Sequence, residues 1–109
     1  MDYLQREALH RLSRAAFGQT YRLEVMLAIA DSEDGLVTLT DVARTLAVST
    51  SNVQGPLKSL IECGLLTPLP QGDSRSRFLM RNRSAAWDWA QEMRDQTRTG
   101  ADAVPVPHH

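Results

Sequence analysis

The chain has 109 residues, the length of one compact domain, of which 42% are hydrophobic and 23% charged. Its single cysteine, Cys63, excludes an intramolecular disulfide and a cysteine-rich zinc site. No apolar run reaches the roughly 18 residues that a membrane helix needs, and the N-terminal residues are too charged for a signal peptide. We therefore expect a cytoplasmic protein that builds its core without disulfides or metals.

The net charge is −1, but the charge is unevenly distributed along the chain. Residues 49–83 carry +3, whereas the rest of the chain carries −4. Such a segment can attract a polyanion, although its arginines could also simply be solvated in a turn. Its cations are Lys58, Arg75, Arg77, Arg81 and Arg83.

Two helices are predicted first. The N-terminal one is amphipathic, with Arg6 and His10 on its polar side, and Gly18 is expected to end or bend it. The second, from Thr20 to about Ala30, is apolar on nearly all sides, which predicts a central place in the core. The apolar stripe of the first helix consists of Leu4, Ala8, Leu9, Leu12, Ala15 and Ala16.

A short strand is expected at residues 36–39, followed by two helices joined by a tight turn. Thr40 is the predicted N-cap of the first of these helices, and Ser49 that of the next. The second helix should run to Cys63, where Gly64 provides a left-handed stop.

Residues 65–69 and 77–80 resemble the strands of a hairpin, with Arg75 near its tip. Pro68 indicates that its strand lies at a sheet edge. Ser84 should cap a last helix that ends near Thr97. We expect residues 1–97 to form one domain and residues 98–109 a disordered tail.

The helix at about residues 50–63 carries Gly55-Pro56, a pair poorly suited to a helix interior. Either the regular helix begins late, with Pro56 in its first turn, or it begins at Thr50 and bends at Pro56. We favour the second interpretation, because Ser49 and Val53 fit a helix start.

The order helix, helix, strand, helix, helix, strand, strand, helix predicts a mainly α fold with a small β-hairpin (α+β). With the stretch TDVARTLAVSTSNVQGPLKSLIECGLL (residues 40–66), this order resembles the winged helix-turn-helix of bacterial transcriptional regulators of the MarR and ArsR types. The resemblance covers roughly residues 21–93. It implies a DNA-binding regulator, most often a repressor, that acts as a homodimer.

Val53, Leu57 and Leu60 should seat the helix at 50–63 on the core. Its opposite face is polar and has small side chains, so it can lie in a DNA major groove. The resemblance assigns the hairpin at 70–77 to the flanking backbone or minor groove. The candidate DNA-binding residues are Ser49, Thr50, Ser51, Asn52, Gln54, Gly55, Lys58, Arg75 and Arg77.

The first and last helices are the candidate dimer elements. Trp87 and Trp89 lie on different faces of the last helix, and we expect Trp87 to be left for a partner subunit. The alternatives are that Trp87 covers the core edge and that the leucine stripe packs on its own domain. The candidate interface residues are Leu4, Leu9, Leu12 and Trp87.

The chain lacks the paired cysteines or the His/Asp set of metal-sensing ArsR-type proteins, so no metal or cofactor is expected. No catalytic arrangement stands out, which argues against an enzyme. Cys63 is expected to be a small core residue. The competing hypothesis for function is a winged-helix adaptor that binds another protein and no DNA.

Overall fold

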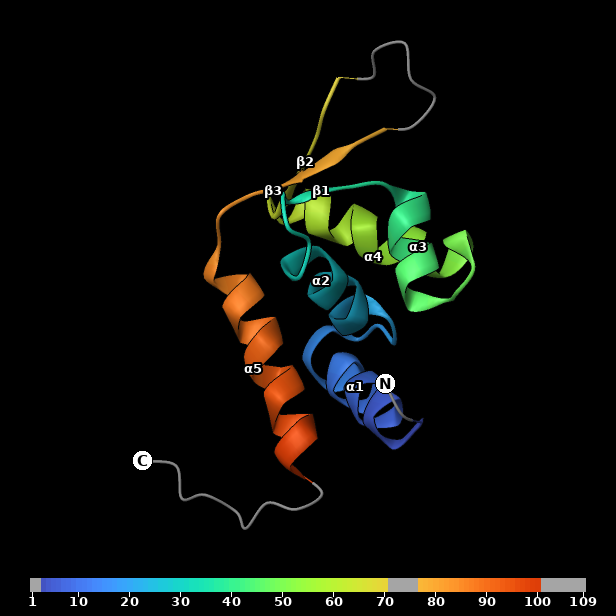
Figure 1. Cartoon of the computed structure of the whole chain (residues 1–109), viewed down its shortest axis with the longest axis vertical. Helices are drawn as coiled ribbons and strands as arrows, with labels where there is room; N and C mark the ends of the chain where they lie inside the picture. Colours follow the sequence, from blue (N-terminus) through green and yellow to red (C-terminus); the bar gives the residue numbers. More distant parts are fainter. Residues whose placement is uncertain (1–2, 71–76, 101–109) are drawn as a thin grey trace.

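The computed structural model describes residues 3–70 and 77–100, which form a helical domain with one small sheet (Figure 1). The order of elements is the one predicted from the sequence. The five helices and three strands are α1 (Tyr3–Phe17), α2 (Arg22–Ala30), β1 (Leu36–Val37), α3 (Leu39–Leu46), α4 (Thr50–Glu62), β2 (Leu66–Pro68), β3 (Leu79–Arg81) and α5 (Ala85–Gly100).

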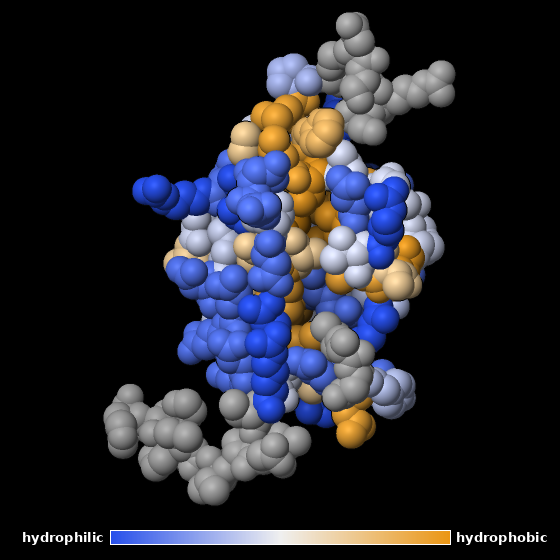
Figure 2. Space-filling model, viewed as in Figure 1, coloured by the Kyte–Doolittle hydropathy of each residue, from blue (hydrophilic) through white to orange (hydrophobic). Residues whose placement is uncertain are grey.

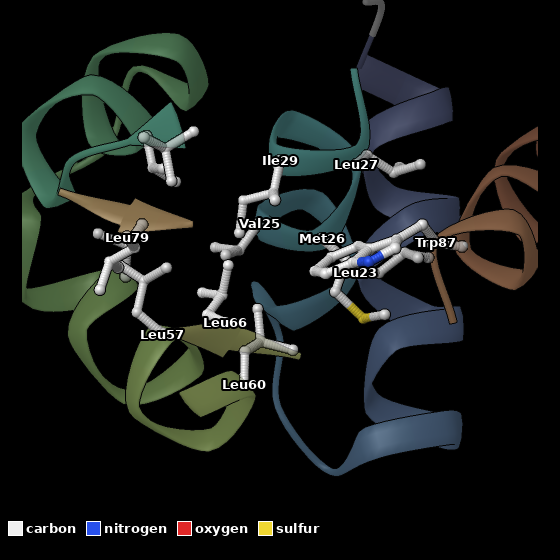
Figure 3. Close-up of a cluster of buried hydrophobic side chains, with 14 of the residues drawn as sticks. Leu23, Val25, Met26, Leu27, Ile29, Leu57, Leu60, Leu66, Leu79 and Trp87 are labelled. Atoms are coloured by element: carbon white, nitrogen blue, oxygen red, sulfur yellow. The ribbon is translucent and has the colours of Figure 1, made fainter. Parts of the chain in front are cut away.

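The most buried helix, α2, lies at the centre of the fold, as its apolar composition predicts (Figure 1). Val25 and Ile29 point towards the leucines of α4 and the sheet (Figure 3). Leu23, Met26 and Leu27 point to the other side, where α1 and Trp87 of α5 lie. The helix therefore joins two halves of one core, in which Leu23, Val25 and Ile29 are fully buried.

The three strands form an antiparallel sheet in the order β1-β3-β2. Pro68 ends β2, which is an edge strand as predicted, so its missing N–H costs no ladder bond. The β2–β3 hairpin is the wing. It rises from the end of the molecule where α3 and α4 lie, whereas α1 and the C-terminal half of α5 lie at the other end (Figure 1).

Three predicted boundaries are confirmed: α1 ends before Gly18, Ser84 accepts a bond from the Ala86 amide at the start of α5, and Gly64 follows α4 with φ +78°. Two predictions were wrong. The cap of α3 is Thr38, whose Oγ1 accepts a bond from the Asp41 amide, so Thr40 lies inside the helix. Helix α5 runs three residues beyond Thr97, into the expected tail, of which residues 101–109 lie outside the described part.

Helices α3 and α4 end in the same way, with a residue in the left-handed conformation and a bond from the next amide to the carbonyl five residues earlier. After α4 the residue is Gly64, and the Leu65 amide donates to the Leu60 carbonyl at 2.9 Å. After α3 it is Ala47, with φ +57°, and the Val48 amide donates to the Ala43 carbonyl at 3.0 Å. The turn between α3 and α4 therefore contains a strained alanine where glycine is the ordinary choice.

This matched pair gives a stability prediction. Ala47→Gly should raise the free energy of unfolding by up to about 1 kcal/mol, because glycine adopts the left-handed conformation without the steric cost that alanine has. Gly64→Ala should lower it by about 1 kcal/mol, because an added Cβ meets no atom within 4 Å and the cost lies in the backbone alone. Urea unfolding of both variants checks this. Two shifts of the same sign would contradict the account of the two turns.

Candidate nucleic-acid interface

Helix α4 runs unbroken from Thr50 to Glu62 with Pro56 inside it, which confirms the early start that the sequence analysis favoured. The ring of Pro56 is buried together with Val53, Leu57 and Leu60. Because proline has no N–H, the Asn52 carbonyl receives no bond from residue 56, and Asn52 lies on the exposed side. The proline thus contributes apolar surface to the core at the cost of one helical hydrogen bond.

The opposite face of α4 is exposed and carries only polar or small side chains. At Gly55 an added Cβ would meet only the Gln19 Nε2, at 4.0 Å. The backbone of α4 can therefore be approached closely at this point. The exposed residues of this face, called here the α4 polar face, are Thr50, Ser51, Asn52, Gln54, Gly55 and Lys58.

The N-terminus of α4 is suited to an anion. Ser49 occupies the N-cap position, as predicted, but its side chain makes no capping bond to the helix amides. Its Oγ lies 2.9 Å from that of Ser51 instead, and both residues are exposed. First-turn amides have no acceptor within the helix, so those of Thr50 and Ser51 are oriented to meet an oxyanion, which the helix dipole also favours.

The wing presents fewer exposed arginines in the described residues than the sequence analysis expected. Arg77 is exposed, but Arg75 lies outside the described residues. Arg81, one of the cations of the basic segment, is committed to the fold: its Nη1 donates to the carbonyls of Ile29, Ala30 and Ser32 at 2.8–3.0 Å. It caps the C-terminus of α2 and fixes the base of the wing there.

Two further polar residues, Arg44 and Gln19, escaped the sequence analysis. Arg44 projects from α3, has a 75% exposed side chain and lies 3.6 Å from Asp41. The sequence signal that could have identified Arg44 is a basic residue on the side of the helix away from the buried Val42 and Ala43. Gln19, from the turn between α1 and α2, donates to the Ser59 Oγ at 3.4 Å. No local pattern reveals that contact, because the two residues are far apart in sequence.

The predicted dimer residues do not form one surface. Leu9 and Trp87 are buried in the core of the same chain, at 0% and 7% exposure, and the Trp87 Nε1 donates to the Asn82 carbonyl at 2.7 Å. Leu12 is partly buried against that core. Leu4 is 77% exposed, and the exposed tryptophan is Trp89, at 45%. The expectation for the two tryptophans was therefore wrong, because α5 packs through the other face.

Cys63, expected in the core, is exposed at the end of α4 and accepts a bond from the Arg22 Nη2 at 3.4 Å. Within residues 3–70 and 77–100, no three His, Cys, Asp or Glu side chains gather in a way that could hold a metal ion. None of the helices in these ranges combines the length and apolar character needed to cross a bilayer.

Comparison with known families matches residues 22–76 to the MarR family. A search of curated proteins finds no significant match. Among solved structures, a MarR-family transcriptional regulator from Silicibacter pomeroyi superposes with a TM-score of 0.70 at 19% identity, over 94% of this chain and 70% of that one. A MarR-family regulator from Rhodococcus sp. RHA1 superposes with a TM-score of 0.68 at 19% identity, over 93% of this chain and 73% of that one.

A third similar structure is that of BpsR from Bordetella bronchiseptica, whose DNA binding is described as regulated by 6-hydroxynicotinic acid. It gives a TM-score of 0.68 at 16% identity, over 94% of this chain and 74% of that one. At these identities the structural matches establish the winged-helix fold of the chain.

Proposed function

The chain belongs to the MarR family, and from this premise we propose that it is a transcriptional regulator that binds a specific double-stranded DNA site through α4 and the wing. The family is one of regulators rather than enzymes. The observation that carries the proposal is the α4 polar face, which is exposed over its whole length and free of large apolar side chains. This is the surface that a helix needs in order to enter a major groove.

Each part of the site has a chemical role in this proposal. The first-turn amides of α4, with Ser49, Thr50 and Ser51, bind phosphate. Asn52 and Gln54 can make paired hydrogen bonds to adenine, and Lys58 can reach a guanine edge or a phosphate. Arg75 and Arg77 of the wing are assigned to the flanking backbone or minor groove.

We also propose that the chain acts as a cytoplasmic homodimer and as a repressor, because a dimer covering two half-sites would exclude polymerase from overlapping DNA. The exposed Leu4 on α1 and Trp89 on α5 are the proposed contacts. Trp89 also packs edge-to-face on Phe17, with ring centroids 5.4 Å apart, so its ring is held in place at the surface.

The alternative function is a winged-helix adaptor for another protein. Two apolar side chains of the wing favour it, since Phe78, just before β3, is 41% exposed and Met80 is 36% exposed. Figure 2 shows an apolar strip on one face of the molecule that reaches up to the wing, between polar surfaces. The two functions differ in how binding depends on salt, which provides the test.

The first test of the proposed function concerns how binding depends on salt. A duplex selected from random DNA should bind with an affinity that falls steeply with salt, because cations on DNA are displaced by Lys and Arg. Lys58→Ala, and Arg75→Ala with Arg77→Ala, should each reduce the slope of log affinity against log salt by about 1 for every phosphate that the variant no longer neutralises. Fluorescence anisotropy between about 50 and about 300 mM salt measures this. An adaptor would select no duplex and show no such slope.

A second prediction separates binding from folding at Gly55. Gly55→Leu should raise the free energy of unfolding by up to about 1 kcal/mol, since leucine favours a helix and the site is open. The same change should abolish specific DNA binding, because the side chain blocks the approach of the backbone. Ser59→Ala, on the flank of the same helix, is the control. Retention of wild-type affinity by Gly55→Leu would contradict the assigned face.

A third prediction concerns the dimer. Leu4→Glu with Trp89→Ala should convert a dimer to a monomer, since both side chains are exposed in the isolated chain and their replacement leaves its core intact. Sedimentation velocity at micromolar concentration measures the mass, and Tyr3→Ser, a change at another exposed residue of the same helix, provides the comparison. Wild-type protein that sediments as a monomer would reject this interface.

A further inference from the structure

The central helix α2 contains one carboxylate that is buried among apolar side chains. Glu24 is 3% exposed and lies between the buried Leu23 and Val25. A buried carboxylate is costly unless it is paired and hydrogen-bonded. Glu24 therefore needs polar partners in the folded chain, and these come from a different helix.

Both partners come from α1. The Nε2 of His10 is hydrogen-bonded to one carboxylate oxygen of Glu24. The Nε of Arg6 lies 3.4 Å from the other. The His10 ring also packs edge-to-face on Tyr21, with centroids 5.1 Å apart. The polar side of α1, which the sequence analysis placed opposite the apolar stripe, thus faces the core at these two positions.

Arg6 makes a second contact, and this one reaches the helix-turn-helix. Its Nη2 donates to the Leu46 carbonyl at 2.9 Å. Leu46 is the last residue of α3, and the next residue is the strained Ala47. One guanidinium therefore joins α1, the buried carboxylate of α2 and the turn that leads into α4.

We infer that Arg6 is a positioning residue for DNA binding: it transmits the placement of α1 to the turn between α3 and α4, and so sets the orientation of α4 on DNA. The inference rests on the proposed function. Glu24 holds the guanidinium at Nε, and the Nη2 is directed at the Leu46 carbonyl. Because α1 is a proposed dimer helix, the same contact would let the pairing of two subunits affect DNA affinity.

The chemistry explains why this residue is an arginine. The planar guanidinium offers several N–H donors on separate nitrogens at fixed angles, so its Nε and Nη2 can meet a carboxylate and a carbonyl together. A lysine has a single nitrogen and would not hold both partners in this geometry. Helix C-terminal carbonyls also have no partner within the helix, so the Leu46 carbonyl gains a bond that the turn does not supply.

The test compares Arg6→Gln with Arg11→Gln, which removes the same charge from an exposed position of the same helix. Hydrogen exchange of the Ala47 and Val48 amides should become faster in Arg6→Gln and stay unchanged in Arg11→Gln. Affinity for the selected duplex should fall about 5-fold or more in Arg6→Gln relative to Arg11→Gln. Affinity for an unrelated duplex should fall equally in both, because there only charge matters.

Equal specific affinities in the two variants, or unchanged exchange at Ala47 and Val48, would overturn the inference. If Arg6→Gln does not fold, Arg6→Lys replaces it, because lysine keeps the charge and has a single nitrogen in place of the separate Nε and Nη2 donors. A wild-type chain that prefers no duplex would instead contradict the proposed function, and the exchange comparison would still show whether Arg6 holds the turn.

Discussion

The central, largely buried position of α2 is the constraint on which the rest of the structure depends. Six of its nine residues are buried and the other three are partly buried. Its polar groups must therefore be satisfied by other elements. The Ser13 Oγ accepts a bond from the Leu23 amide, Arg81 caps the C-terminal carbonyls, and Arg6 and His10 pair with Glu24. These contacts fix α1 and the wing against one central rod.

The same constraint positions the candidate interface. The leucines of α4 and of the sheet pack on the side of α2 that carries Val25 and Ile29 (Figure 3). With that face of α4 committed to the core, its polar side is turned outwards. Arg81 fixes the base of the wing to the C-terminus of α2. The proposed DNA-binding surface is thus placed by contacts of other residues, and Arg6 adds a link from α1 to the turn before α4.

Much of the fold could be predicted from the sequence because its signals are local. Gly18 and Gly64 end helices through their own backbone conformations, and Pro68 marks an edge through its missing donor. The order of elements follows from such boundaries and from hydrophobic periodicity. The α4 polar face was also accessible, because periodicity alone shows which residues oppose Val53, Leu57 and Leu60.

What could not be predicted depends on which distant elements meet. Trp87 and Trp89 have similar sequence contexts, and only the packing of α5 on α2 decides which is buried. From the sequence pattern, His10 and Arg6 are expected to be solvated, and only the folded structure places the buried Glu24 beside them. The left-handed Ala47 carries no glycine signal, and the bonds of the surrounding turn hold it there.

The central claim is that the outward side of α4, with the wing, is the surface that meets DNA. The most direct measurement is the change in amide NMR chemical shifts when a selected duplex is added to the labelled protein. The account predicts the largest changes at residues 49–59 and in the wing, with little change at the exposed side of α5. Shifts concentrated on α5 or on the first turn of α1, with α4 unaffected, would contradict it.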